Sequence, residues 1–273
     1  MTKQREQVVM ISKRELVSVV VPIFNEEDGI GQLKQKLLCL RDLLADDFDV
    51  EFVFVDDGSS DATVSALHHH FAGQPVTFRV VEHIVNRGVG AAFRTGFQHS
   101  TGAFVCTIDA DCSYSPEGLR LLLTTLRVSG DDIAVASPYH PQGGVEGVPA
   151  WRLVLSKGCS MLYRMLSPLK LYTYTSIFRA YREEVVRRVP FKSDGFVSAA
   201  EILLAAGRRG YTVAEVPMVL RARNLGRSKM KVARTTLLHL KMLFGFILPA
   251  SSAPVPSKRP VTAMSKRKEA NVA

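Results

Sequence analysis

The chain has 273 residues, of which 47% are hydrophobic, and its formal net charge is +9. A chain of this length and composition buries a sizeable core, which excludes a protein that is disordered throughout. The four cysteines are scattered and form no CxxC pair. This spacing favours a reduced, cytosolic protein over a disulfide scaffold or a zinc module.

The positive charge is unevenly distributed along the chain. Residues 1–14 carry a net charge of +3 and residues 251–273 a net charge of +4. Residues 15–203 hold 17 basic and 23 acidic side chains, whereas residues 204–250 hold nine basic and one acidic. An acidic front part and a basic rear part favour a protein that handles phosphates or an anionic surface over one that binds nucleic acid.

Short β-branched runs alternate with longer helical patterns through the first half of the chain. The predicted strands are residues 16–22, 50–55, 76–82, 103–108 and 132–137, and the predicted helices are residues 28–44, 61–71, 89–99 and 116–128. Apolar strands joined by helices predict an α/β domain with a parallel sheet covered on both faces. Ligands of such sheets bind at the carboxyl ends of the strands.

The second half of the chain has a looser pattern. A Gly/Pro-rich loop at 138–150 precedes a predicted helix at 151–166, a βα-like segment at 173–207 and, at 211–231, a strand that turns into a basic loop. We assign residues 16–231 to one catalytic domain.

The chain ends and the last apolar stretch carry separate predictions. Residues 1–15 are expected to be flexible and residues 251–273 to be a disordered basic tail. Met1–Arg14 are polar, which predicts a protein that is not exported. A helix within residues 232–250 would measure about 25 Å, short of the ~30 Å hydrocarbon core of a bilayer. It is expected to pack on the core or to lie on a membrane surface.

Polar residues and glycines follow four consecutive predicted strands. The segments are "PIFNEED", "DDGSSD", "NRGVGAAFRTG" and "DADCSYSPE". An ordinary capped turn explains any one of them, but four together favour a binding site along one edge of the sheet. Gly88 and Gly90 in the third segment indicate a close backbone approach, to a phosphate or a sugar.

Asp109 and Asp111, at the end of the fourth strand, can both reach one divalent cation, and their hard oxygen ligands suit Mg²⁺ or Mn²⁺. A capped turn before Pro116 is the structural alternative. An aspartate-nucleophile phosphatase also carries DxD after a strand, although normally the first strand. A dinucleotide-binding oxidoreductase is suggested by Gly88-x-Gly90, but Phe93 stands where a further glycine is expected.

Six motifs, in order, resemble those of family 2 glycosyltransferases with the GT-A fold, most of all the polyprenyl-phosphate (dolichol-phosphate mannose synthase-like) type. They are "VPIFNEE", "FVFVDDGSSDAT", "NRGVGAAFRTG", "DADCSYSPE", "YTSIFRAYR" and "RNLGRSKM". The resemblance covers roughly residues 17–245 and implies a GT-A fold with a mostly parallel central sheet and helices on both faces.

The resemblance also implies roles for individual residues. The donor-binding set that it suggests is Pro22, Asn25, Glu26, Asp56, Asp57, Gly88, Asp109, Ala110, Asp111, Arg223 and Lys229. The implied metal ligands for Mg²⁺ or Mn²⁺ are Asp109, Asp111 and Ser113, and the implied catalytic residues are Asp111, Arg152, Arg223 and Lys229. Arg152 and Ser156, spaced i and i+4 on one helix face, match positions near an acceptor phosphate.

The implied reaction is inverting transfer of a sugar from GDP-mannose or a UDP-hexose to a polyprenyl (dolichyl or undecaprenyl) phosphate. It would take place at the cytoplasmic face of a membrane, with peripheral membrane contact and a membrane-protein partner as further expectations. A lipid phosphate is already anionic near pH 7, so no strong general base is required. Transfer to a hydroxyl of a soluble or cell-envelope glycan is the alternative, and it would need a base such as Glu201 or an acid near 194–201.

Several positions depart from the family pattern. Ser113 stands where a glutamine is frequent, and Pro138 stands where an arginine is usual. Thr173 and Ile177 replace an acid and a glycine. Glu201, an acid in an otherwise apolar helix, is expected to orient Arg179 or a substrate hydroxyl, or to form a structural ion pair.

Overall fold

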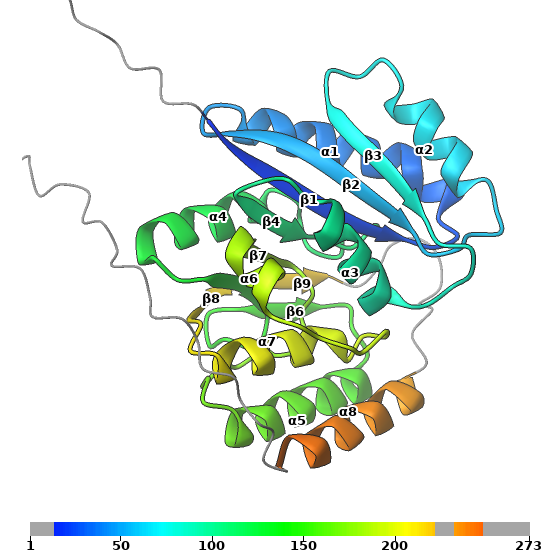
Figure 1. The fold of residues 1–273 in the computed structure, drawn as a ribbon. Coiled ribbons are helices and arrows are strands. Elements are labelled where there is room, and N and C mark those ends of the chain that lie inside the picture. Colours follow the sequence, from blue (N-terminus) through cyan, green and yellow to red (C-terminus); the bar gives the residue numbers. More distant parts are fainter. Residues whose placement is uncertain (1–13, 222–231, 248–273) are drawn as a thin grey trace, which may run out of the picture.

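The computed structural model describes residues 14–221 and 232–247 (Figure 1). The predicted donor-binding residues Arg223 and Lys229 lie outside the described residues, as do the predicted tail at 251–273 and most of the N-terminal segment.

A seven-stranded sheet forms the centre of the molecule, in the order β3-β2-β1-β4-β7-β5-β8 (Figure 1). Its strands are β1 (Glu15–Ile23), β2 (Phe48–Asp56), β3 (Thr77–Glu82), β4 (Phe104–Thr107), β5 (Ile133–Ser137), β7 (Arg179–Arg182) and β8 (Val213–Pro217). Neighbouring strands are parallel except at β7, which is antiparallel to β4 and β5. The predicted mostly parallel sheet is therefore confirmed.

Burial on both faces explains why the central strands could be predicted from the sequence. In β1, residues 17–21 are all buried, and in β2 residues 51–56 are all buried. A strand with helices on both sides is mostly apolar, so it appears in the sequence as a nearly continuous apolar run. The buried polar pair Ser18 and Glu51 is satisfied by a hydrogen bond between the two side chains. The four-residue β7, "RAYR", carries no such run, and the sequence did not separate it from its surroundings.

Helices cover both faces of the sheet. One face packs against α1 (Ile30–Leu44), α2 (Thr63–Phe71) and α4 (Gly118–Ser129), with a short 3-10 helix (Glu27–Gly29) before α1. The other face packs against α3 (Val89–His99), α6 (Glu183–Arg188) and α7 (Ser198–Arg208).

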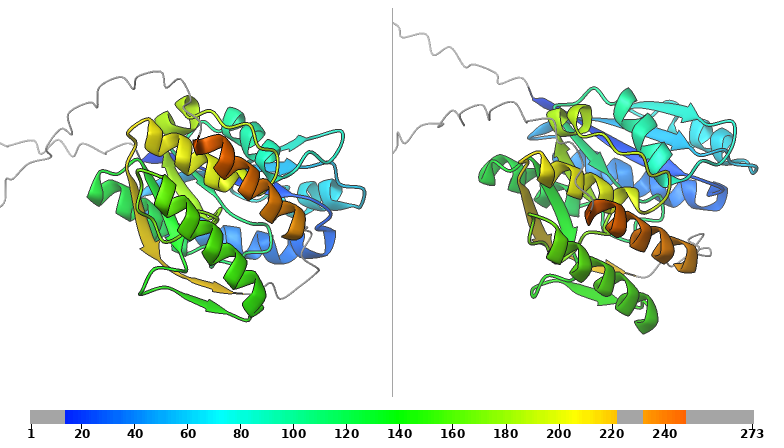
Figure 2. Two further views of the ribbon diagram at one scale, coloured as in Figure 1. Left: turned by 90° about the horizontal axis from the view of Figure 1, so that it is seen from below. Right: turned by 60° about the horizontal axis from the view of Figure 1, so that its bottom comes forward.

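Two further helices, α5 (Ala150–Leu166) and α8 (Val232–Ile247), lie side by side beyond α7 (Figures 1 and 2). The Tyr163 hydroxyl of α5 lies 2.6 Å from Nδ1 of His239 on α8, and both side chains are buried. A two-stranded parallel sheet, β6 (Gly144–Glu146) with β9 (Val219–Arg221), completes the structure in the described ranges. Each helix within residues 14–221 and 232–247 is too short or too polar to cross a bilayer.

Candidate active site

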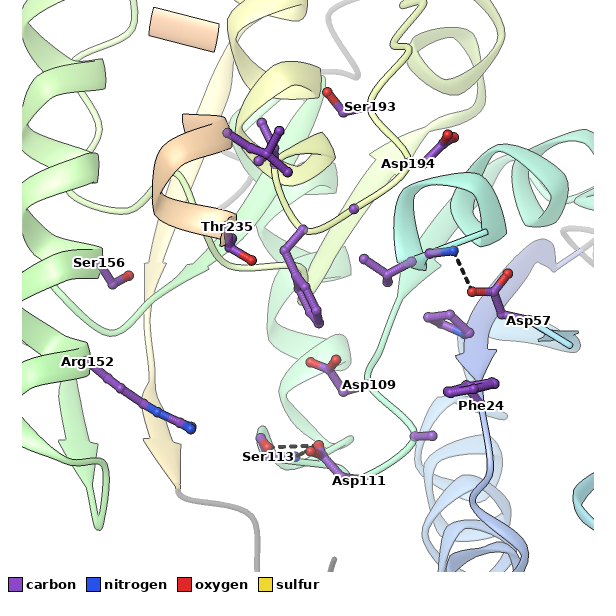
Figure 3. Close-up of a pocket in the computed structure, with 18 of the residues that line it drawn as sticks. Phe24, Asp57, Asp109, Asp111, Ser113, Arg152, Ser156, Ser193, Asp194 and Thr235 are labelled. Carbon is purple, nitrogen blue, oxygen red and sulfur yellow. Dashed lines mark hydrogen bonds between the residues drawn. The ribbon is translucent and has the colours of Figure 1, made fainter. Parts of the chain in front are cut away.

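A cavity of about 1350 Å³ opens where the carboxyl ends of β1, β2 and β4 meet. Figure 3 shows Phe24 and Asp57 on one wall, Arg152 and Ser156 of α5 on the opposite wall, and Asp109 between them. All four strand-end segments singled out in the sequence contribute lining residues. The predicted clustering at one edge of the sheet is confirmed.

Most of the predicted site residues that the structure describes line this cavity. They are Pro22, Glu26, Asp57, Gly88, Asp109, Ala110, Asp111, Ser113, Arg152 and Ser156. Asn25 and Asp56 do not line the cavity. The buried Asp56 accepts hydrogen bonds from the Ser59 backbone N–H, at 2.9 Å, and from the Ser59 hydroxyl, which in turn accepts the Asn25 N–H at 2.8 Å. Both residues fasten the segment after β2 to the segment after β1.

Asp57 is held by three donors. Its Oδ1 lies 2.7 Å from Nδ1 of His83 and accepts the Arg87 N–H at 3.0 Å, while its Oδ2 accepts the Gly88 N–H at 2.6 Å (Figure 3). Gly88 has φ 102°, a backbone conformation that favours glycine. Nε2 of His83 lies 2.8 Å from the Thr95 hydroxyl. No motif marked His83 in the sequence, and Thr95 lies within the third strand-end segment but was not singled out.

A tight turn presents the two aspartates that follow β4. The Cys112 N–H donates to the Asp109 carbonyl at 3.0 Å, and Cys112 itself has φ 50°. The Ser113 N–H and hydroxyl both donate to Oδ1 of Asp111, at 2.9 and 2.8 Å (Figure 3). Ser113 therefore orients one carboxylate of the pair.

The chemistry of this turn fits Mg²⁺ or Mn²⁺. Asp109 and Asp111 supply hard carboxylate oxygens to the cavity. Among the residues that the structure describes, no group of three or more His, Cys, Asp or Glu side chains could hold a metal ion. Phosphate and water oxygens would therefore complete the coordination of an ion bound here, as is usual for Mg²⁺ at phosphate sites.

Arg152 faces the cavity from α5 (Figure 3). Its Nε is buried without a hydrogen bond, and its side chain forms no ion pair within residues 14–221 and 232–247. Its guanidinium lies 5.3 Å from the ring centroid of Trp151. Ser156, one turn along, lies 2.9 Å from the Thr175 hydroxyl. An unpaired guanidinium in a cavity is suited to an anionic ligand.

The close approach predicted at Gly88 and Gly90 is real, but its partner is the chain's own backbone. A Cβ on Gly90 would lie 2.2 Å from the Ser193 carbonyl oxygen, and one on Gly88 would lie 2.5 Å from that of Asp194. The Asp194 carbonyl accepts the N–H groups of Gly90, at 2.6 Å, and Ala91, at 3.3 Å. These donors at the start of α3 are therefore not available to a phosphate, contrary to our expectation.

The predicted pairing of Glu201 with Arg179 is wrong. The Glu201 carboxylate accepts the backbone N–H groups of Lys192, at 3.0 Å, and Ser193, at 2.8 Å. The buried Arg179 donates instead to the carbonyls of Tyr174 and Ala199, at 2.9 and 2.7 Å. Glu201 fixes the loop that contacts α3.

A carboxylate does lie beside Thr173, and it comes from β8. Glu215 accepts the Thr173 N–H at 2.9 Å, the Ser137 hydroxyl at 2.7 Å and the Tyr172 N–H at 2.8 Å. Sequence reasoning missed Glu215, although it is the single acidic residue in the basic segment 204–250. A carboxylate from a distant strand thus lies beside residue 173, where the family pattern has an acid.

The cavity wall from α8 was also missed. Thr235, Leu238, Lys241 and Met242 all line the cavity, and Figure 3 shows Thr235 beside it. His239 packs behind this wall, and burial lowers its pKa to about 4, so the imidazole is neutral at pH 7.

The chain matches the model of the family described as glycosyl transferase family 2 over residues 18–189. A polyprenol monophosphomannose synthase from Mycolicibacterium smegmatis is 31% identical over 220 residues, which cover 78% of this chain and 80% of that protein. A dolichol-phosphate mannosyltransferase from Pyrococcus furiosus is 31% identical over 230 residues, covering 84% of this chain and 62% of that longer protein.

Solved structures share the fold at lower identity. A glucosyl-3-phosphoglycerate synthase from Mycobacterium tuberculosis, in complex with Mn²⁺, uridine diphosphate and phosphoglyceric acid, superposes with a TM-score of 0.63. It is 21% identical, and the match covers 87% of this chain and 80% of that chain. A complex of the same enzyme with Mg²⁺ and uridine diphosphate also has a TM-score of 0.63, at 20% identity and with 87% and 81% covered.

A cavity at the carboxyl ends of parallel strands, with a DxD turn at its centre, is the arrangement expected of a GT-A glycosyltransferase. The chain belongs to glycosyl transferase family 2, and the expected GT-A fold is confirmed. This assignment leaves the oxidoreductase and phosphatase alternatives without support.

Proposed function

We propose that this protein transfers a sugar, with inversion, from a nucleotide-sugar donor to a polyprenyl phosphate. The observation that carries the proposal is the Arg152 guanidinium, which has no ion-pair partner among the described residues and faces the same cavity as Asp109 and Asp111. The names of the two relatives at 31% identity, a polyprenol monophosphomannose synthase and a dolichol-phosphate mannosyltransferase, support this acceptor class.

The donor would bind along the strand ends. Pro22, Glu26, Asp57 and Gly88 would form the nucleoside side of the cavity, with Asn25 and Asp56 fixing the loops behind them. Mg²⁺ or Mn²⁺, held by Asp109 and Asp111, would neutralise the charge that develops on the diphosphate leaving group. Ser113 would act by orienting Asp111, and Ala110 would line the diphosphate subsite.

Arg223 and Lys229 remain part of the proposal as donor-diphosphate ligands. They belong to the segment that follows Arg221, whose backbone N–H donates to the Ser113 carbonyl at 3.1 Å. Arg221, the last residue described before this segment, therefore lies beside the DxD turn. Arg223 and Lys229 follow Arg221 closely in the sequence, so both cations could pair with one diphosphate bound at this turn.

The acceptor phosphate would bind to Arg152, with Ser156 nearby on α5. A phosphate oxygen would attack the anomeric carbon, the bond from that carbon to the diphosphate oxygen would break, and the nucleoside diphosphate would leave with the electron pair. Positioning and charge stabilisation would supply the catalysis. The hydroxyl-acceptor alternative gains no support, because the Glu201 carboxylate is bonded to two backbone amides and Asp194 is paired with Arg94.

The acceptor side would rest on the cytoplasmic face of a membrane. Val154, Met161 and Met165 of α5 are 69%, 67% and 68% exposed, and Leu237 of α8 is 67% exposed. Leu238 of α8 is 41% exposed and also lines the cavity, so apolar surface reaches the cavity mouth. Exposed apolar helix faces of this kind bind the interface of a bilayer, from which a lipid phosphate could enter.

The acceptor class is tested with radiolabelled GDP-mannose and UDP-hexoses, each incubated with Mn²⁺ in the presence and absence of polyprenyl phosphate. We expect label to enter the organic phase only when the lipid is present. A donor that is consumed without extractable product would refute the lipid acceptor and favour a hydroxyl acceptor.

The membrane contact is tested by co-sedimentation with vesicles that contain anionic lipid. The double variant Met161→Glu/Met165→Glu should lose most of its vesicle binding. The matched control is Leu121→Glu/Val128→Glu on α4, whose side chains are 50% and 83% exposed on a helix of the opposite sheet face. Equal binding by both double variants would contradict the proposed membrane face.

A further inference from the structure

The carboxylate of Asp57 has a limited number of acceptor positions, and the structure accounts for most of them. Each carboxylate oxygen can accept about two hydrogen bonds. Within residues 14–221 and 232–247, Oδ1 has two partners, His83 and the Arg87 N–H, whereas Oδ2 has one, the Gly88 N–H. Asp57 lines the cavity although its side chain is only 5% exposed. One acceptor position on Oδ2 is therefore left for a ligand.

His83 determines how this carboxylate is held. A carboxylate is an acceptor only, so Nδ1 of His83 must carry the proton in the 2.7 Å contact with Asp57. The His83 side chain is 7% exposed, and its backbone N–H donates to the Asp56 carbonyl at 2.9 Å. On the far side of the ring, Nε2 meets the Thr95 hydroxyl of α3 at 2.8 Å. The imidazole is thus fixed from both of its nitrogens.

We propose that His83 and Thr95 are positioning residues for recognition of the donor nucleoside. Together they hold Asp57 so that the remaining acceptor position on Oδ2 takes one hydrogen from the nucleoside, either an imino N–H of the base or a ribose O–H. The inference rests on the proposed function, because it assigns a nucleoside to this wall of the cavity. Neither residue lines the cavity, so their effect on a ligand must pass through Asp57.

Two features distinguish this role from ordinary packing. The three donors on Asp57 all lie in the connection between β3 and α3, so the carboxylate, which follows β2, ties that connection to the neighbouring strand end at the cavity wall. In addition, a carboxylate with fewer protein donors would keep unused acceptor positions on both oxygens, and it could then rotate. A fixed acceptor with a single open position discriminates between ligands, because a mismatched group leaves a buried carboxylate oxygen unsatisfied.

The test is calorimetric binding of UDP and GDP, with Mn²⁺ present, to the full chain and to three variants. His83→Ala should weaken binding of the preferred nucleotide about tenfold, the usual cost of losing a hydrogen bond to a charged group. His83→Asn, whose amide can replace the Nδ1 donor, should recover most of the affinity. Thr95→Val should give a smaller loss, and in transfer assays the donor KM should rise more than kcat falls.

Thr125→Val is the matched control for the threonine variant. Thr125 lies on α4, and its hydroxyl donates to the Leu121 carbonyl within the helix, at 2.8 Å. It should leave nucleotide affinity unchanged. UDP methylated at N3 lacks the imino hydrogen of the base, and 2′-deoxy-UDP lacks one ribose hydroxyl. The analogue that binds more weakly than UDP to the wild type, but not to His83→Ala, identifies the nucleoside hydrogen that Asp57 accepts.

The outcomes separate the two proposals. If the wild-type chain binds neither UDP nor GDP, the proposed function fails, and this inference fails with it. If the wild type binds and His83→Ala binds equally well, only the positioning role is overturned. Equal losses in His83→Ala and His83→Asn, in proportion to their losses of thermal stability, would also overturn it. Should His83→Ala fail to fold, Thr95→Val at wild-type affinity gives the same negative answer.

Discussion

The two walls of the cavity are built in different ways. On the donor wall, polar groups are bound to the protein: Asp57 has three donors, and Asp56 is satisfied by Ser59. On the acceptor wall, Arg152 lacks an ion-pair partner among the described residues, and α5 exposes Met161 and Met165. The donor wall is organised before its ligand arrives, whereas the acceptor wall has charge and apolar surface that a lipid phosphate and a membrane would cover.

Asp111→Asn should have the largest effect, because it acts where the two walls meet. It removes one of the two carboxylate charges that would hold the cation at the donor diphosphate. Sugar transfer should fall by at least about 10³-fold, and Mn²⁺-dependent nucleotide binding should be lost. Radiolabel transfer and calorimetry measure these effects. Ser113→Ala, which removes only an orienting hydroxyl, should cost about tenfold; wild-type turnover in Asp111→Asn would refute the metal site.

Arg152→Ala separates the acceptor wall from the donor wall. Loss of the guanidinium should lower transfer to polyprenyl phosphate about 10²-fold while the affinity for nucleoside diphosphate stays near that of the wild type. Arg164→Ala is the control, because Arg164 lies on the same helix but does not line the cavity. The acceptor is dissolved in detergent for this comparison. Equal losses of transfer activity in Arg152→Ala and Arg164→Ala would show that α5 contributes positive charge but no specific phosphate ligand.

Gly90→Ala probes the rigidity of the donor wall. A methyl group at this position meets the Ser193 carbonyl oxygen at 2.2 Å, so the loop must shift away from α3. We expect the free energy of unfolding to fall by about 2–3 kcal/mol, as in overpacked cores. Gly158→Ala is the matched helical control: with nothing within 4 Å, it should raise stability by about 0.5–1 kcal/mol. Urea denaturation measures both; similar changes in the two variants would disprove the close contact.

Acidification should weaken the acceptor wall through His239. Its pKa is lowered by burial to about 4 in the folded protein, from the ordinary 6.5. Between these values the unfolded chain binds a proton that the folded chain does not, so stability is complete above pH 6.5 and decreases as the pH falls toward 4. At pH 5 the loss is about 2 kcal/mol.

Hydrogen exchange of α8 between pH 7 and pH 5 measures this loss. His239→Gln, which cannot titrate, should show a flatter pH dependence than the wild type. Parallel pH profiles for the two proteins would mean that the imidazole is not buried against Tyr163 as the structure shows.

Much of the fold and part of the site were predictable from the sequence. The strands β1 and β2 are buried on both faces and therefore appear as nearly continuous apolar runs, interrupted by Ser18 and Glu51. Topology then places polar strand-end segments together, which is how Asp57, Asp109 and Asp111 were found. Arg152 and Ser156 followed from helical spacing combined with the family resemblance.

Contacts between distant segments were not predictable in this way. Three findings depend on pairs of residues at least eight positions apart: the carbonyl groups that Gly88 and Gly90 approach, the backbone amides that Glu201 binds, and the contact of Glu215 with Thr173. No local periodicity carries such information. His83 belongs to the same class, because its neighbours Asp57 and Thr95 come from other elements.

By itself, the amino-acid sequence determined the alternation of strands and helices, the edge of the sheet where polar groups gather, and the DxD turn, because each follows from local pattern and from the direction of parallel strands. Only the tertiary structure decided which carboxylates are already satisfied and that Arg152 has no ion-pair partner in the part of the chain that the structure describes. Hydrogen bonds and burial are set by whatever the folded chain brings within about 3 Å, irrespective of separation in sequence. The donor wall at Asp57 is therefore held by contacts within the protein, whereas the acceptor wall at Arg152 would gain its ionic partner from the ligand.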